Sequence, residues 1–176
     1  EGSVTRGMEV VEFATGIPHL LKGEHSDSVG TDVDSWSVRA PVGVCVGITP
    51  FNFPAMVPMW MFPLAIGCGN TFVLKPSERD PTLSLRLAEL LQEAGLPDGL
   101  LQVVIGGADV GEAVLTDPRV PVISFTGSTE AGRRVGALAG SHLKRAHLEL
   151  GGNSAMLILD DDRRYSVTGS DLELAL

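Results

Sequence analysis

The chain has 176 residues, 44% of them hydrophobic and 20% charged, a balance typical of one globular domain rather than of a disordered chain. Its 13 basic and 22 acidic residues give a formal net charge of −9 at pH 7. This charge argues against nucleic acid or an anionic membrane as the main partner, because both are bound by clustered Lys and Arg.

The first half of the chain predicts helices and strands in alternation. In order they are a helix over residues 4–21, a strand over 42–49, a buried helix over 55–67 and a short strand over 71–75. Asp80 as N-cap and Pro81 at the first helical position then predict a helix that runs to Ala94, where Gly95 ends it.

The second half continues this alternation. It predicts strands over residues 101–105, 120–126, 146–150 and 155–159, with helices over 109–116 and 130–138. Because the strands are apolar along most of their length, they are expected to be parallel and covered on both faces. The predicted fold class is therefore α/β, a doubly wound, mostly parallel sheet of the Rossmann type, which binds ligands at the carboxyl ends of its strands.

Cysteines and apolar runs set further limits on the class of protein. Cys45 and Cys68 are predicted to be buried thiols in a reducing, cytoplasmic compartment, since two cysteines supply neither a disulfide framework nor a zinc site of the usual spacing. The mixed charges of residues 1–22 are not those of a signal peptide. The most apolar run, residues 53–68, contains three prolines and is shorter than the roughly 20 residues of a membrane span, so a buried helix is expected.

A glycine turn follows the strand predicted over residues 120–126. Gly127, Ser128 and Gly132 stand in a G-x-x-x-x-G pattern between this strand and the next helix. Backbone N–H groups at the start of a helix lie at the positive end of its dipole and suit a phosphate or pyrophosphate. The pattern lacks the middle glycine of the dinucleotide fingerprint. Taken alone, it is explained equally well by a glycine turn and a serine helix cap.

Two charged residues, Lys75 and Glu78, stand at the end of the strand predicted over residues 71–75. A lysine and a glutamate at a carboxyl edge are able to hold the hydroxyl groups of a ribose. For this motif by itself, a solvated charged loop is the favoured interpretation, because such residues are mostly exposed.

Asn52 and Glu149 are candidates for a catalytic role. Asn52 lies in a loop between two aromatic and two proline residues, where its amide either makes a turn or donates to a developing oxyanion. Glu149 falls in an apolar strand, where desolvation is expected to raise its pKa and suit it to act as a general base. Alternation along the strand would instead turn its side chain outward to water.

Together these motifs resemble the aldehyde dehydrogenase superfamily over about residues 4–161. The first half is most similar to methylmalonate-semialdehyde dehydrogenases, in GITPFNFPAMVPMWMFPLAIGCGNTFVLKPSERDP. The second half is more similar to the general hydrolytic members, in ISFTGSTEAGRRVG and HLELGGNSAMLILDD. These stretches are long and specific, and their order along the chain matches that of the family.

The resemblance implies that NAD is the cofactor. It assigns Lys75 and Glu78 to the adenosine ribose, and the carboxylate of Glu78 favours NAD over NADP because it would repel a 2′-phosphate. Ser128 is implied to meet the pyrophosphate. The remaining residues that the resemblance places along the cofactor are Thr49, Phe51, Arg79, Gly127, Gly132 and Leu150.

The resemblance also implies a reaction, in which a cysteine attacks an aldehyde, a hydride passes to NAD and the thioester releases the acid. Asn52 would stabilise the oxyanion, and Glu149 would activate the water that hydrolyses the thioester. The family's nucleophilic cysteine corresponds to neither Cys45 nor Cys68 and is expected beyond residue 176. The isolated chain is therefore predicted to be inactive as a dehydrogenase, because no covalent step occurs without that thiol.

Several expectations concern the organisation of the protein. Residues 1–162 are predicted to form part of an NAD-binding domain, with 35–41 as the start of an oligomerisation strand and 163–176 as a divergent tail. A homo-oligomer is expected for the intact protein. The semialdehyde branch passes its acyl group to coenzyme A and generally lacks the Glu-Leu-Gly-Gly motif, so Glu149 favours hydrolysis, with coenzyme A as the alternative acceptor.

Two other classes of protein remain as alternatives. One is a truncated, non-catalytic chain that binds a nucleotide or a partner subunit. The other is a short-chain reductase, which is disfavoured because the only tyrosine, Tyr165, has Gly169 rather than a lysine four residues later.

Overall fold

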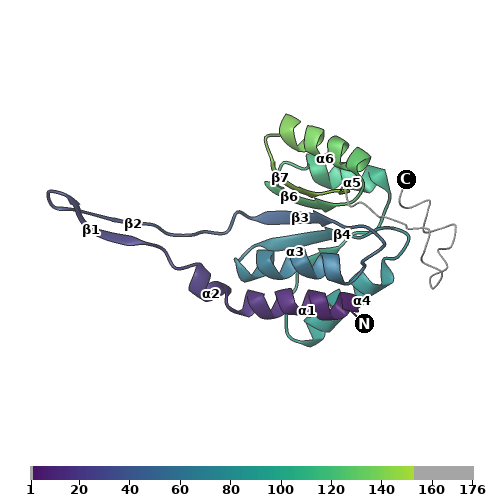
Figure 1. Ribbon diagram of the computed structural model, residues 1–176, viewed down its shortest axis with the longest axis horizontal. Coiled ribbons are helices and arrows are strands. Elements are labelled where there is room, and N and C mark those ends of the chain that lie inside the picture. The colour runs from purple at the N-terminus through teal and green to yellow at the C-terminus, as the bar shows by residue number, and fades with distance from the viewer. Residues whose placement is uncertain (1, 153–176) are drawn as a thin grey trace, which may run out of the picture.

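A five-stranded parallel sheet is the centre of the fold in the computed structural model, which describes residues 2–152 (Figure 1). The strand order is β5-β4-β3-β6-β7. Every neighbouring pair in this sheet is parallel. The predicted doubly wound α/β fold is therefore confirmed. The strands are β3 (Val44–Ile48), β4 (Thr71–Lys75), β5 (Leu101–Val103), β6 (Val122–Thr126) and β7 (Arg145–Glu149).

Helices cover both faces of the sheet. In Figure 1 one layer holds α1 (Gly2–Thr15), α3 (Met56–Gly67) and α4 (Thr82–Glu93), and the opposite layer holds α5 (Ala108–Thr116) and α6 (Thr129–Ser141). The short helix α2 (Ile17–Leu20) follows α1. No helix within residues 2–152 is long and apolar enough to cross a membrane.

Two hydrophobic clusters form the core, one on each face of the sheet. Cys45 belongs to the cluster beneath α3 and α4, and its neighbour Val46 belongs to the cluster beneath α5 and α6. Phe72 and Leu74 of β4 lie in the first cluster, and Ile123 of β6 lies in the second. This alternation follows from the period of two in a strand, which turns consecutive side chains to opposite faces.

An antiparallel hairpin projects away from the body of the molecule (Figure 1). It consists of β1 (His25–Gly30) and β2 (Val33–Trp36), and every residue in both strands is exposed. The segment 35–41, which was predicted as the start of an oligomerisation strand, overlaps the end of β2 at Trp36. The first strand was not predicted, because its polar sequence HSDSVG carries no apolar alternation. The role of this segment in an oligomer stays a prediction.

Helix boundaries differ from the prediction at two places. The helix predicted over residues 4–21 is divided at Gly16 into α1 and α2. The prediction that Asp80 caps α4 is wrong, because Pro81 occupies the N-cap position and the helix begins at Thr82. The strand predicted over 155–159 and the tail over 163–176 lie outside the described residues.

Candidate functional site

The candidate site lies at the carboxyl ends of β3 and β6, which are neighbours in the sheet. From β3 the chain passes through α3 to β4 on one side, and from β6 it passes through α6 to β7 on the other side. Such a change of direction leaves a crevice outside the sheet edge, where doubly wound folds bind ligands. Two cavities occur there, and they are called here the helical cavity and the loop cavity.

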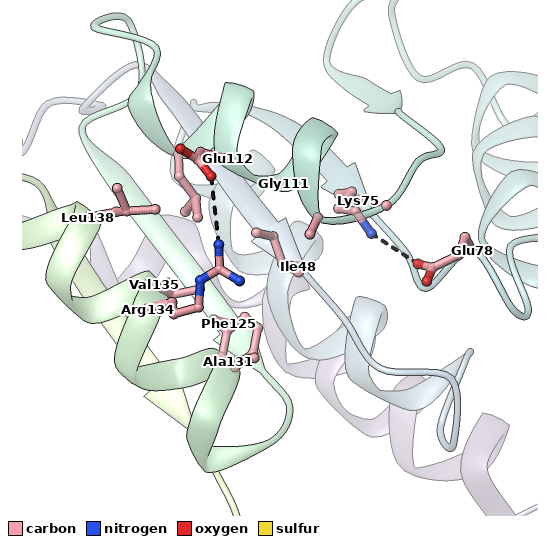
Figure 2. Close-up of a pocket in the computed structure, with 13 residues that line it drawn as sticks. Ile48, Lys75, Glu78, Gly111, Glu112, Phe125, Ala131, Arg134, Val135 and Leu138 are labelled. Atoms are coloured by element: carbon pink, nitrogen blue, oxygen red, sulfur yellow. Dashed lines mark ion pairs between the residues drawn. The ribbon is translucent and has the colours of Figure 1, made fainter.

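The helical cavity has a volume of about 250 Å³ and lies between α5 and α6 (Figure 2). Its lining is mostly apolar, with four charged side chains that form two ion pairs. Figure 2 shows these pairs on either side of Ile48. An apolar slot with a few polar groups at its margin is typical of a site for a small organic ligand. The lining residues are Ile48, Lys75, Glu78, Gly107, Ala108, Gly111, Glu112, Leu115, Phe125, Ala131, Arg134, Val135 and Leu138.

Lys75 is a buried cation at one end of the helical cavity. It is the last residue of β4 and is 6% exposed. Its Nζ donates to the carbonyl oxygen of Pro76 at 3.1 Å and lies 3.6 Å from Oε2 of Glu78. An ammonium group has three donors, so this arrangement leaves donors for hydroxyl groups of a ligand.

Glu78 remains a carboxylate to lower pH than an ordinary glutamate. A hydrogen bond from its own backbone N–H holds the pKa of the Glu78 carboxyl below its usual value. A small loss of hydration opposes this effect, and the charges of Lys75 and Arg79 add to it. The mouth of the helical cavity therefore carries a fixed negative charge beside a buried positive one.

The loop cavity has a volume of about 510 Å³ and is lined by the loops that follow β3, β6 and β7 and by the start of α3. It brings together Asn52, Ser128 and Glu149, which are far apart in the sequence. Phe51 also lines it, and the guanidinium of Arg79 lies 5.0 Å from the centre of the Phe51 ring. This cation–π contact links the loop after β3 to the loop after β4.

The first turn of α6 stands between the two cavities. Ser128 lines the loop cavity and Ala131 lines the helical cavity. Ser128 is the N-cap of α6, where its Oγ accepts a hydrogen bond from the backbone N–H of Ala131 at 3.3 Å. The hydroxyl hydrogen and the other free N–H groups of this turn are suited to a phosphate. The cap and the phosphate site that the sequence offered as alternatives are thus compatible.

Ser128→Ala is expected to lower the free energy of unfolding by about 1 kcal/mol, because the helix loses its N-cap acceptor. Ser128→Asp keeps a capping oxygen and is expected to retain stability, although its charge would repel an anionic ligand. Thermal and urea denaturation of the three proteins measure the difference. Equal stability of the Ala variant and the wild type would contradict the capping role.

Glycines give the loop cavity its close packing. A methyl group on Gly127 would lie 2.6 Å from Cζ of the buried Phe125, and one on Gly132 would collide with the side chain of Leu150. The structure therefore gives both glycines a packing role, and their contact with a cofactor stays a prediction. Leu150 lines the loop cavity. Thr49 is 4% exposed, and its backbone N–H donates to the backbone carbonyl oxygen of Lys75 at 3.1 Å.

Glu149 is exposed, so the expectation that it is desolvated in an apolar strand is wrong. Its side chain is 61% exposed, and Oε1 lies 3.1 Å from Nε2 of His147. Both residues belong to β7, which is an edge strand of the described sheet. The alternation of this strand turns His147 and Glu149 to the same face, which explains their contact.

The two cysteines differ in burial. Cys45 is buried, and this burial raises the pKa of its thiol above the ordinary value. Cys68 is partly exposed, so the prediction that both thiols are buried holds only for Cys45. Both cysteines are free.

Two walls of the helical cavity, those from α5 and α6, have no signal in the sequence. Glu112 and Arg134 face each other there, with Oε2 and Nη2 separated by 3.9 Å (Figure 2). In the sequence they are ordinary charged residues of amphipathic helices, 22 positions apart. Only the packing of α5 beside α6 reveals that they share a site.

The sequence matches the aldehyde dehydrogenase family over residues 1–168. It is 53% identical over 169 residues to a malonate-semialdehyde dehydrogenase of Pseudomonas aeruginosa, covering 95% of this chain and 34% of that protein. The chain thus spans about one third of the length of this relative.

Solved structures show the same fold. A methylmalonate-semialdehyde dehydrogenase of Oceanimonas doudoroffii superimposes with a TM-score of 0.84 at 56% identity, covering 86% of this chain and 31% of that one. A Sinorhizobium meliloti protein assigned to the same class of enzyme and complexed with NAD gives 0.82 at 54% identity, with 84% and 30% covered.

Proposed function

Since the chain belongs to the aldehyde dehydrogenase family, we propose that it supplies the NAD-binding part of an enzyme that oxidises an aldehyde or semialdehyde. The observation that carries this proposal is the pair of cavities that meet at the first turn of α6. A dinucleotide has two aromatic ends joined by a pyrophosphate, and this arrangement offers two cavities joined by a helix N-terminus. The relatives named above are enzymes for malonate and methylmalonate semialdehydes, which supports a semialdehyde as the substrate.

The residues at the site fit NAD in charge and in shape. The apolar helical cavity suits the adenosine, and Lys75 and Glu78 at its margin would bind the ribose hydroxyls. The turn at Ser128 suits the pyrophosphate, and the loop cavity suits the nicotinamide end. The cofactor would supply the acceptor for the hydride of the aldehyde.

Two side chains of the loop cavity have properties suited to the chemical steps. Asn52 carries an amide N–H that is able to donate to the aldehyde oxygen as negative charge develops there. Glu149 carries a carboxylate that is able to accept a proton from water. One relative, from Arabidopsis thaliana, has "acylating" in its name, so coenzyme A stands beside water as a candidate acyl acceptor.

Calorimetric titration of the chain with NAD and with NADP tests the proposal. NAD is expected to bind at least about tenfold more tightly, because the Glu78 carboxylate repels a 2′-phosphate. Glu78→Gln is expected to reduce this preference by about tenfold, since it removes the charge and keeps the size. Glu89→Gln is a matched control, because Glu89 is about as exposed as Glu78 and also pairs with a cation three positions away, but it lies on α4.

The two parts of the proposal fail in different ways. If neither nucleotide binds to a folded chain, the assignment of the cavities to NAD is wrong. If NAD and NADP bind equally to the wild-type chain, the site holds a nucleotide but Glu78 does not select it.

A further inference from the structure

Arg134 and Glu112 close one side of the helical cavity from opposite walls (Figure 2). Arg134 comes from α6 and Glu112 from α5, and their side chains are 71% and 56% exposed. The 3.9 Å between Nη2 and Oε2 is long for an ion pair. An exposed pair of this kind contributes only about 0–1 kcal/mol to folding, so stability does not account for its position.

The position of Arg134 on α6 directs it to the cavity. Ala131 and Leu138 also line the cavity, and they stand three residues before and four residues after Arg134. Residues at these spacings share one face of a helix. The neighbouring Arg133 is exposed and falls on another face, outside the cavity lining. The two arginines therefore have similar exposure but different relations to the site.

The chemistry of a guanidinium group matches a purine base. The group is planar, weakly hydrated and positively charged, so it stacks on the face of an aromatic ring better than an ammonium group does. The side chains that line the cavity between the two ion pairs are apolar. These side chains are able to make van der Waals contact with a base, but they supply no groups that could form hydrogen bonds with its edges. A planar cation at the mouth of such a slot covers the side of a flat ring that the slot leaves open.

We propose that Arg134 covers the adenine ring of the cofactor by stacking its guanidinium on the base, and that Glu112 is the positioning residue that holds the guanidinium over the cavity. This inference rests on the proposed function, because it takes the helical cavity as the adenosine site. It adds a binding residue to that site, on the helix wall opposite to Glu112. Stacking, rather than recognition of the base edges, then determines the affinity for the adenine end.

Calorimetric titration of the full 176-residue chain with NAD and with ADP tests this role. Arg134→Ala is expected to weaken the binding of both ligands by about fivefold and by the same factor, since both contain the adenine. Arg134→Lys is expected to recover little of this loss, because it restores the charge without the plane. Arg133→Ala is the control on the same helix and is expected to leave both dissociation constants unchanged.

Glu112→Gln tests the positioning role separately. It is expected to weaken NAD binding by about twofold in the wild-type background and to have no effect in the Arg134→Ala background, because Glu112 acts only through the arginine. An equal effect of Glu112→Gln in both backgrounds would overturn that role. Circular dichroism of each variant shows whether its fold is retained.

Specific outcomes overturn the stacking role while leaving the proposed function intact. One is unchanged or tighter NAD binding by Arg134→Ala. This result would mean that the ion pair has no effect on NAD binding or hinders the entry of NAD into the cavity. Another is full recovery by Arg134→Lys, which would make charge alone sufficient. If the wild-type chain binds neither NAD nor ADP, the proposed function itself fails, and this inference fails with it.

Discussion

Leu74→Ala is expected to lower the free energy of unfolding by about 2 to 5 kcal/mol, the range for a buried leucine that leaves a cavity. Leu74 has no exposed surface and lies in β4, between β3 and β5. It is paired in register with Gly47 and Val103 on its two sides. Because hydrogen bonds hold both neighbouring strands, the sheet is poorly able to collapse into the space left by the missing atoms.

Urea denaturation of the wild type and the variant measures this loss. Leu143→Ala is the matched control, because Leu143 is 95% exposed and its truncation is expected to change stability by no more than about 0.5 kcal/mol. A loss below about 1 kcal/mol for Leu74→Ala would contradict the packing described for this face of the sheet. A marginally stable chain with this substitution would show less helical signal even without urea.

Lys75→Met is expected to raise the dissociation constant for NAD by about 10- to 100-fold. Hydrogen bonds to a charged group contribute about 1.5 to 3 kcal/mol, and the methionine retains the apolar stem but has no donor for the ribose hydroxyls. The loss is expected to appear in binding and not in folding. A buried ammonium group is costly to desolvate, so its removal is expected to leave the free energy of unfolding unchanged or higher.

The measurement is a calorimetric titration with NAD together with urea denaturation of the same protein. Lys22→Met is the control, because Lys22 is exposed, follows the C-cap of α2 and takes no part in the lining of either cavity. Unchanged NAD binding by a folded Lys75→Met variant would exclude Lys75 from the ribose site. Reduced stability without reduced binding would show that the lysine serves the fold alone.

The sequence was informative where neighbouring residues have strong preferences for one type of local structure. The strands at 44–48 and 122–126 fall within the segments 42–49 and 120–126, which the sequence predicts as strands because they are short, apolar and β-branched. The parallel arrangement of the strands is expected from their burial on both faces. Ser128 was predicted as a helix cap or phosphate ligand, because serine between a glycine turn and a helix has few other roles. The family resemblance rests on the stretches that contain these strands and the loops after them.

The sequence failed where the outcome depends on neighbours that are distant along the chain. Glu149 was expected to be desolvated, but it lies in an edge strand and its side chain is exposed. Pro81 was placed one position too far into α4, because the local pattern fits either position. The exposed strand β1 gave no signal, since it buries no face and therefore has no apolar period.

Local sequence thus determined the strands, the helices, the glycine turn and the type of chemistry near each strand end. Those properties depend on residues within one or two turns of each other, whose steric and hydrogen-bonding preferences act before the chain is folded. Only the tertiary structure decided which side chains meet. The packing of α5 against α6 brings Glu112 next to Arg134, and the order of the strands brings Asn52 and Glu149 into one cavity. Both follow from burial of the apolar faces, which fixes the helices and strands in one arrangement.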